Sequence, residues 1–116
     1  MNEKILKWLF DIIAAIEEIE SFFEDVPKDF NLYKSNLILK RAIERDLEII
    51  GEAVNRIIKT DNNFPIENAK RIIGLRNQII HAYDNVSDES IWAILLKHIP
   101  VLKTEIVQLI EENSDF

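Results

Sequence analysis

The chain has 116 residues, with no cysteine, only two glycines, only three prolines and no long apolar run. Without cysteine it forms neither disulfides nor thiolate metal sites. So few glycines and prolines argue against a turn-rich β-sandwich or barrel. No apolar stretch reaches the ~18 residues that a membrane-spanning helix needs. The start, Met-Asn-Glu-Lys, lacks the basic region and apolar core of a signal peptide. We therefore expect a cytoplasmic protein that does not enter a membrane.

Acidic residues outnumber basic ones, 21 against 14, which gives a net charge of -7. A strongly basic nucleic-acid-binding protein has the opposite balance. The excess is concentrated in residues 3–25, whereas residues 34–59 and 66–83 each carry about two more bases than acids. Two mildly basic helices beside an acidic one can still create a positive local field. The alternative is ordinary solvated faces with a chance imbalance.

Apolar residues recur at spacings of three and four along most of the chain, which predicts amphipathic helices. Asn31 or Ser35 is expected to cap the second helix, and Ser87 the last one. Pro100 should kink the last helix or split it near His98. The predicted helices cover residues 3–24, 31–59 or 35–59, 66–83 and 88–112.

Four long helices joined by short loops imply antiparallel neighbours. The sequence therefore predicts an all-α fold with a single domain over residues 1–116. Its expected architecture is an up-and-down antiparallel four-helix bundle, with five helices if the last one splits at Pro100.

Helix 66–83 carries an arginine on its apolar side. On a wheel of about 100° per residue, Arg76 lies in the middle of the apolar arc, flanked by isoleucines on both sides. A guanidinium on such a stripe is costly unless it is paired. One interpretation is an ion pair between Arg76 and Glu52 or Glu48 inside the bundle. Another is that the apolar stem of the Arg76 side chain is buried while its guanidinium group reaches water. A third is contact with a phosphate or a second subunit, because the paired donors of a guanidinium fit phosphate oxygens.

His81 and Asn77 lie four residues apart on a neighbouring polar edge of the same helix. A histidine near a helix C-terminus often only complements the helix dipole, yet imidazole also transfers protons near neutral pH. Arg76 and His81 are about 140° apart around the wheel, so one ideal helix cannot bring both onto one small group. Two copies meeting at a two-fold axis can. Tyr83 shares the face of Arg76, where its plain interpretation is a core or interface aromatic.

The stretch Arg76 to Tyr83 reads Arg-Asn-Gln-Ile-Ile-His-Ala-Tyr. Together with Gly51-Glu52-Ala53 on the preceding helix, the Pro-containing turn between them and Trp92 downstream, it resembles the HEPN superfamily, in particular its HepT-like branch. The resemblance extends along nearly the whole chain. It implies an all-helical bundle that forms a two-fold homodimer.

The resemblance also implies a function. Many such proteins are metal-independent ribonucleases, and HepT-like members are usually the toxin of a toxin–antitoxin pair. Carried over by position, Arg76 and His81 are catalytic and Asn77 supports them. Tyr83 is the residue to which a MntA-like minimal nucleotidyltransferase antitoxin transfers AMP from ATP, which silences the toxin.

Metal-free RNA cleavage needs a base for the 2′-hydroxyl, an acid for the leaving 5′-oxygen and positive donors on the phosphate. One chain supplies a single motif histidine, whereas a homodimer supplies two imidazoles and two guanidiniums in one cleft. We therefore expect a dimeric endoribonuclease acting on RNA. No metal is expected, because His81 and the surface histidine His98 match no ligand pattern. No cofactor is expected, because no glycine-rich phosphate loop is present.

Two other functions stay open. The chain can be a non-catalytic helical module that docks a nucleotidyltransferase, a role that suits the negative net charge. It can also be a structural protein in which Arg76 forms a buried ion pair within one subunit. Cleavage of RNA in the presence of a chelator separates the first hypothesis from these two.

Overall fold

The structure is a computed structural model that describes residues 2–81 and 87–113, with the backbone alone for Ala69 and residues 78–81. Every regular element in these ranges is a helix, which confirms the all-α prediction. The helices are α1 (Glu3–Phe22), α2 (Phe30–Ser35), α3 (Leu37–Thr60), α4 (Ala69–His81), α5 (Asp88–Lys97) and α6 (Ile99–Asn113).

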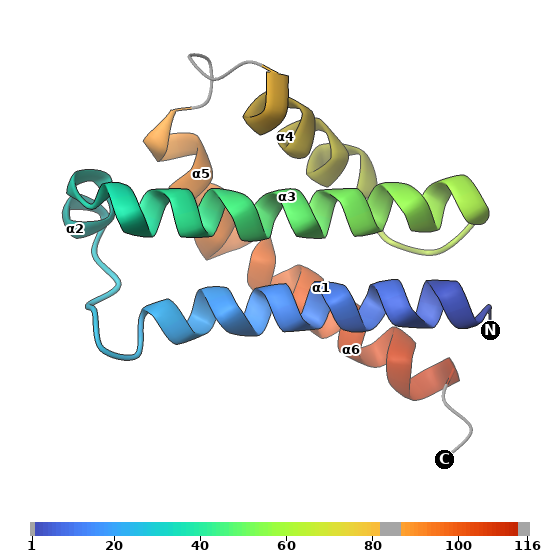
Figure 1. Ribbon diagram of the computed structural model, residues 1–116. Helices are drawn as coiled ribbons and strands as arrows, with labels where there is room; N and C mark the ends of the chain where they lie inside the picture. Colours follow the sequence, from blue (N-terminus) through green and yellow to red (C-terminus); the bar gives the residue numbers. More distant parts are fainter. Residues whose placement is uncertain (1, 82–86, 114–116) are drawn as a thin grey trace.

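Helix α3 is central to the arrangement. It packs against α1, α2 and α4, while α6 packs against α1 and α5. Figure 1 shows α1 and α3 antiparallel and side by side, with α4 on another side of α3 and with α5 and α6 behind the pair. Within the described ranges, no helix has both the length and the apolar character needed to cross a membrane.

The second long helix starts later than predicted. Asn36, with extended backbone, is its N-cap, and the Asn36 side chain accepts a hydrogen bond of 3.0 Å from the backbone N–H of Leu39. The predicted caps Asn31 and Ser35 are therefore wrong, because both lie inside the separate short helix α2. Asp29 begins that helix by accepting from the backbone N–H of Asn31 at 2.8 Å.

The last predicted helix is split as expected. Helix α5 ends at Lys97 and α6 begins at Ile99, so the break falls at His98. Pro100 occupies the first turn of α6, where its missing N–H breaks no helical hydrogen bond. The Ser87 cap of α5 is also confirmed, since its hydroxyl accepts from the backbone N–H of Ser90 at 3.1 Å.

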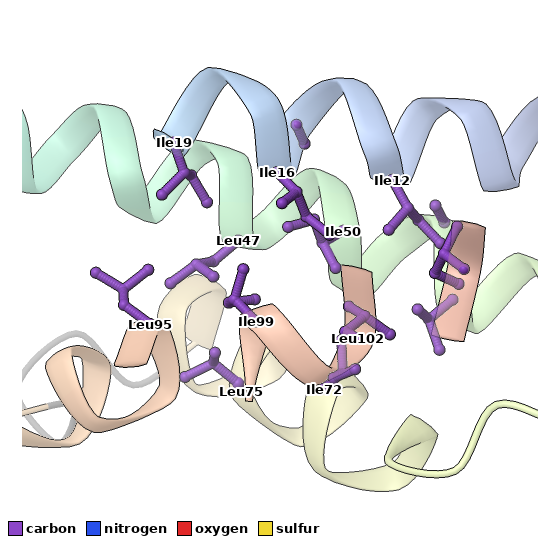
Figure 2. Close-up of a cluster of buried hydrophobic side chains, with 14 of the residues drawn as sticks. Ile12, Ile16, Ile19, Leu47, Ile50, Ile72, Leu75, Leu95, Ile99 and Leu102 are labelled. Atoms are coloured by element: carbon purple, nitrogen blue, oxygen red, sulfur yellow. The ribbon is translucent and has the colours of Figure 1, made fainter. Parts of the chain in front are cut away.

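All six helices contribute buried residues to the hydrophobic core, α2 through Tyr33 alone. Figure 2 shows side chains from α1, α3, α4, α5 and α6 converging on one volume. Helix α4 contributes Ile72 and Leu75, which are 7% and 6% exposed. These two residues fix which side of α4 faces inward, and so also the direction in which its polar residues point. The residues labelled in Figure 2 are Ile12, Ile16, Ile19, Leu47, Ile50, Ile72, Leu75, Leu95, Ile99 and Leu102.

A cluster of aromatic rings holds the start of α5 against α2 and the end of α1. The ring of Trp92 lies 5.3 Å from that of Tyr33, 5.9 Å from that of Phe30 and 6.0 Å from that of Phe23, measured between centroids. The Tyr33 side chain is fully buried, and burial raises the pKa of its phenol. Next to the cluster, Lys40 Nζ lies 3.0 Å from an oxygen of Asp88 and ties α3 to the first residue of α5.

One charged residue, Asp46 on α3, lies among the buried residues of the described chain, with 2% of its surface exposed. Its Oδ2 atom has no hydrogen-bond partner among the described residues. Burial raises the pKa of Asp46 to about 7, and the neighbouring carboxyl of Glu18 on α1 adds to the rise, while Arg45 opposes it. A carboxyl in this setting binds a proton far more readily than the same residue in the unfolded chain.

We predict that stability falls as the pH rises through this range. An unfolded aspartate titrates near 3.9 and Asp46 in the folded chain near 7. Between these values the folded state binds more protons, so the free energy of unfolding decreases with pH and levels off above about pH 8. At about 1.4 kcal/mol per pKa unit, this loss is on the order of 2–4 kcal/mol. Urea unfolding should show that Asp46→Asn removes most of the decrease, whereas the exposed control Asp11→Asn keeps it. Equal decreases in both variants would contradict the assignment.

Candidate functional site

Helix α4, which carries the motif, crosses α3 at a glycine. A Cβ atom on Gly51 of α3 would collide with the Cβ of Arg76 and would lie 3.1 Å from the carbonyl oxygen of Ile72. No other residue type leaves room for such an approach. The contact therefore sets both the depth at which α4 sits on α3 and the point from which the Arg76 side chain starts.

The Arg76 side chain leads from this contact towards the surface. Its stem lies over Gly51, and its Nη1 donates a hydrogen bond of 3.1 Å to Oδ1 of Asn77 in an exposed position. Its Nε is buried and has no hydrogen-bond partner within the described ranges. This geometry matches the interpretation in which the stem packs and the charge reaches water.

The predicted alternative of an ion pair with Glu52 or Glu48 is wrong for the described chain. Among those residues, no carboxylate lies within 4.0 Å of the Arg76 guanidinium. Glu52 instead accepts from Nη2 of Arg56, one turn further along α3, at 2.6 Å. Arg76 is thus a half-buried cation whose described partner is a neutral amide, and a charge in that position favours an anion.

The other motif residues follow from the regular geometry of α4. The helix continues to His81, so His81 stands five residues after Arg76, about 7.5 Å along the axis and about 140° around it. The described part of His81 is its backbone, and Tyr83 lies outside the described residues. Of the predicted site residues, the structure brings Arg76 and Asn77 together, and the positions of the imidazole and the phenol stay predictions.

Open space borders α4 at Gly74. A Cβ atom on this glycine would have no neighbour within 4 Å outside the local helix backbone. Gly74 precedes His81 by seven residues, so both lie on one side of the helix. A ligand can therefore approach the backbone of α4 closely at Gly74, on the side of the helix that also carries position 81.

A second arginine and histidine meet at the other end of α4. Nη1 of Arg71 lies 2.7 Å from Nε2 of His98 at the α5–α6 break. A guanidinium only donates, so Nε2 of His98 is the acceptor in this contact. His98, predicted as a surface histidine, is half-buried and has Arg71 as a partner. The two partners are 27 positions apart in the sequence, so no local sequence signal pointed to this contact.

The charges on α4 suit the binding of an anion. The helix carries Lys70, Arg71 and Arg76 and no acidic residue, although the whole chain has a net charge of -7. Within the described chain, no three histidine or acidic side chains come together in the way that a metal ion requires. Helix α4 is thus a basic element of an acidic chain, and the positive local field expected beside it stays a prediction.

Comparison with known proteins connects this arrangement to a family. The family model described as Ribonuclease HepT-like matches residues 12–109. The chain is 35% identical over 109 residues to the protein named "Putative RNase MJ1380" from Methanocaldococcus jannaschii, covering 91% of this chain and 97% of that protein. It is also 35% identical over 116 residues to "Putative RNase TTE0752" from Caldanaerobacter subterraneus, covering 97% and 93%.

A further relative carries the family name itself. "Probable ribonuclease HepT" from Thermococcus cleftensis is 35% identical over 107 residues, which cover 88% of this chain and 92% of that protein. No solved structure matches the chain significantly. The family match covers all of α3, α4 and α5 and therefore the whole Arg76 to His81 motif. The chain belongs to the HepT-like ribonuclease family.

Proposed function

We propose that the chain is a metal-independent endoribonuclease that cleaves RNA at a site formed by Arg76 and His81 from two copies. The observation that carries the proposal is Arg76, a half-buried guanidinium fixed at its root by Gly51 and left without a carboxylate partner in the described chain. The family membership supports RNA as the anion that we propose for this cation.

The reaction divides its roles between the two residue types. One His81 imidazole takes the proton of the 2′-hydroxyl, and the freed oxygen attacks the adjacent phosphorus. The bond from phosphorus to the 5′-oxygen breaks, and the second His81, as imidazolium, gives that oxygen a proton. Arg76 donates to the non-bridging oxygens as their negative charge grows. The products are a 2′,3′-cyclic phosphate and a free 5′-hydroxyl.

The geometry of α4 supports a homodimer as the active form. On one regular helix the two residue types diverge by about 140°, so a single copy does not place both on one phosphate. A two-fold axis beside α4 supplies a second guanidinium and a second imidazole from the facing copy. Asn77 then has a positioning role, because its Oδ1 already holds the Arg76 guanidinium.

We predict a specific chemistry for the cleavage. The purified chain should cut RNA in excess EDTA and leave 2′,3′-cyclic phosphate and 5′-hydroxyl ends. An oligonucleotide with a single 2′-deoxy residue at the cleavage position should not be cut there, because it lacks the nucleophile. Mass spectrometry of the fragments reads both results. Cleavage of the 2′-deoxy substrate, or activity that EDTA removes, would contradict the mechanism.

We further propose that the chain is a toxin silenced by a MntA-like nucleotidyltransferase antitoxin. AMP attached to Tyr83, two residues after His81, would add bulk and negative charge beside the cleft and repel an RNA phosphate. Co-expression with a nucleotidyltransferase of this type should therefore increase the mass of the chain by whole AMP units that map to Tyr83, with loss of RNA cleavage. Tyr83→Phe should remain unmodified and active in the same cells. Modification at another residue would disprove the assignment of Tyr83.

The negative net charge favours a second candidate function, a non-catalytic module that docks such a nucleotidyltransferase. Its charge suits a protein partner better than RNA. It predicts binding of the nucleotidyltransferase without any cleavage by the free chain, so the EDTA experiment decides between the two.

A further inference from the structure

A groove of about 880 Å³ runs between α1 and α3. Three alanines, Ala14 and Ala15 on α1 and Ala42 on α3, line it, and their short side chains leave the space between the helices unfilled. Asp46 lines the groove on α3, and Asp11 and Glu18 line it on α1. The Gly51 contact with α4 lies about 140° away around α3, so the groove is separate from the proposed RNA site.

Asp46 has a hydrogen-bond acceptor in this groove, on its carboxyl group, that is not satisfied by the described residues. Its carboxyl is 2% exposed, and Oδ2 has no hydrogen-bond partner among the described residues. A buried carboxylate oxygen without a donor is destabilising. The neighbouring Glu18 is a second acceptor and therefore cannot satisfy an ionised Asp46. Below about pH 7 a proton on Asp46 can be shared with Glu18, and once both carboxyls are ionised the pair lacks a positively charged donor.

The cations that line the same groove do not supply that donor. Arg41 forms an ion pair with Glu44 at 2.9 Å. The groove's acidic residue Asp11 already has a cation of its own, because it forms an ion pair with Lys7 at 2.9 Å. Arg45 is close enough to favour the charged form of Asp46, yet it forms no ion pair within 4.0 Å in the described chain. Glu18 and Arg45 are exposed, so both can rearrange around an incoming group without loss of packing.

We propose that the α1–α3 groove seats an arginine side chain of a partner protein, whose guanidinium bridges Asp46 and Glu18. A guanidinium offers five N–H donors in one plane and so can serve two carboxylates together. Its apolar stem suits walls made of alanine, with Phe22 and Ile49 beside them. The groove is open to solvent, which suits a side chain presented by a protein surface. The proposal does not depend on ribonuclease activity.

The test uses the full chain and a small probe, N-acetyl-arginine amide, followed by amide chemical shifts in NMR. Shifts should be confined to residues 11–22 and 41–49. N-acetyl-citrulline amide, which is close in shape but neutral, should cause none. Because binding needs ionised Asp46, affinity should rise about tenfold from pH 6 to pH 8, with Asp11, Glu18, Arg41 and Arg45 as the other charged groups facing the site.

Two variants make the outcome decisive. Asp46→Asn should lose the binding and its pH dependence, while Glu17→Gln, on the same helix as Glu18 but outside the groove, should keep both. A thermal melt confirms that each variant is folded, and both should cleave RNA at the wild-type rate. The proposal is overturned if no amide shifts, if citrulline amide or Asp46→Asn gives the same shifts, or if spermidine binds the groove more tightly than the arginine probe, since the occupant is then a free polyamine.

Discussion

Replacing Arg76 with alanine is expected to lower the rate of RNA cleavage at least a hundredfold, because removal of one positioned donor to a developing oxyanion costs about 10²–10³ in rate. The fold should survive. The Cβ that meets Gly51 is retained in alanine, and the buried, unpartnered Nε that it removes contributes no hydrogen bond in the described chain. The RNA cleavage rate and the urea unfolding curve are measured on the same preparation of Arg76→Ala and compared with those of the wild-type chain.

Two controls separate charge from position. Arg56→Ala removes an exposed arginine of α3 that pairs with Glu52, and it should leave the cleavage rate unchanged. Arg76→Lys keeps the charge but loses the planar pair of donors, so it should recover only part of the activity. His81→Ala should match Arg76→Ala. Wild-type cleavage by folded Arg76→Ala or His81→Ala protein would exclude the proposed site.

The long helices could be predicted because each buries a continuous apolar stripe, as Ile12, Ile16 and Ile19 do in α1. The break at Pro100 followed from the missing N–H of proline. Helix α2 could not be found in this way, because six residues make too few turns for a period to be visible. Its boundaries depend on which of several asparagines and aspartates caps a helix, and the extended backbone at Asn36 decides that.

The sequence predicts the candidate site only as far as a single helix allows. The wheel singled out Arg76 because a guanidinium on an apolar stripe is unusual. Its seat on Gly51 depends on how α4 crosses α3, which no periodicity reveals. A glycine inside a strong helix was nevertheless a signal, because it costs about 1 kcal/mol relative to alanine and points to a close approach. Asp46 gave a similar signal, since it lies on α3 between the buried residues Ile43 and Leu47.

The second large effect is expected at that glycine. Gly51→Ala should lower the free energy of unfolding by roughly 1–2 kcal/mol. On an isolated helix the change would be favourable by about 1 kcal/mol, but overpacking of a close contact costs about 1–3 kcal/mol and occasionally more. The new Cβ meets the Cβ of Arg76 and the carbonyl oxygen of Ile72, and neither atom can rotate away. Helix α4 must therefore move off α3, and RNA cleavage should fall because the Arg76 guanidinium moves with it.

Gly74→Ala is the matched control, since the same added methyl group meets nothing within 4 Å there. It should stabilise the chain by about 0.5–1 kcal/mol, the ordinary gain for this exchange in a helix. A double-mutant cycle identifies the contact itself. In an Arg76→Gly background, where the opposing Cβ is absent, Gly51→Ala should cost less than in the wild-type chain. If Gly51→Ala is as harmless as Gly74→Ala, or costs the same with and without the Arg76 side chain, then α4 is not held at the depth on which the position of Arg76 depends.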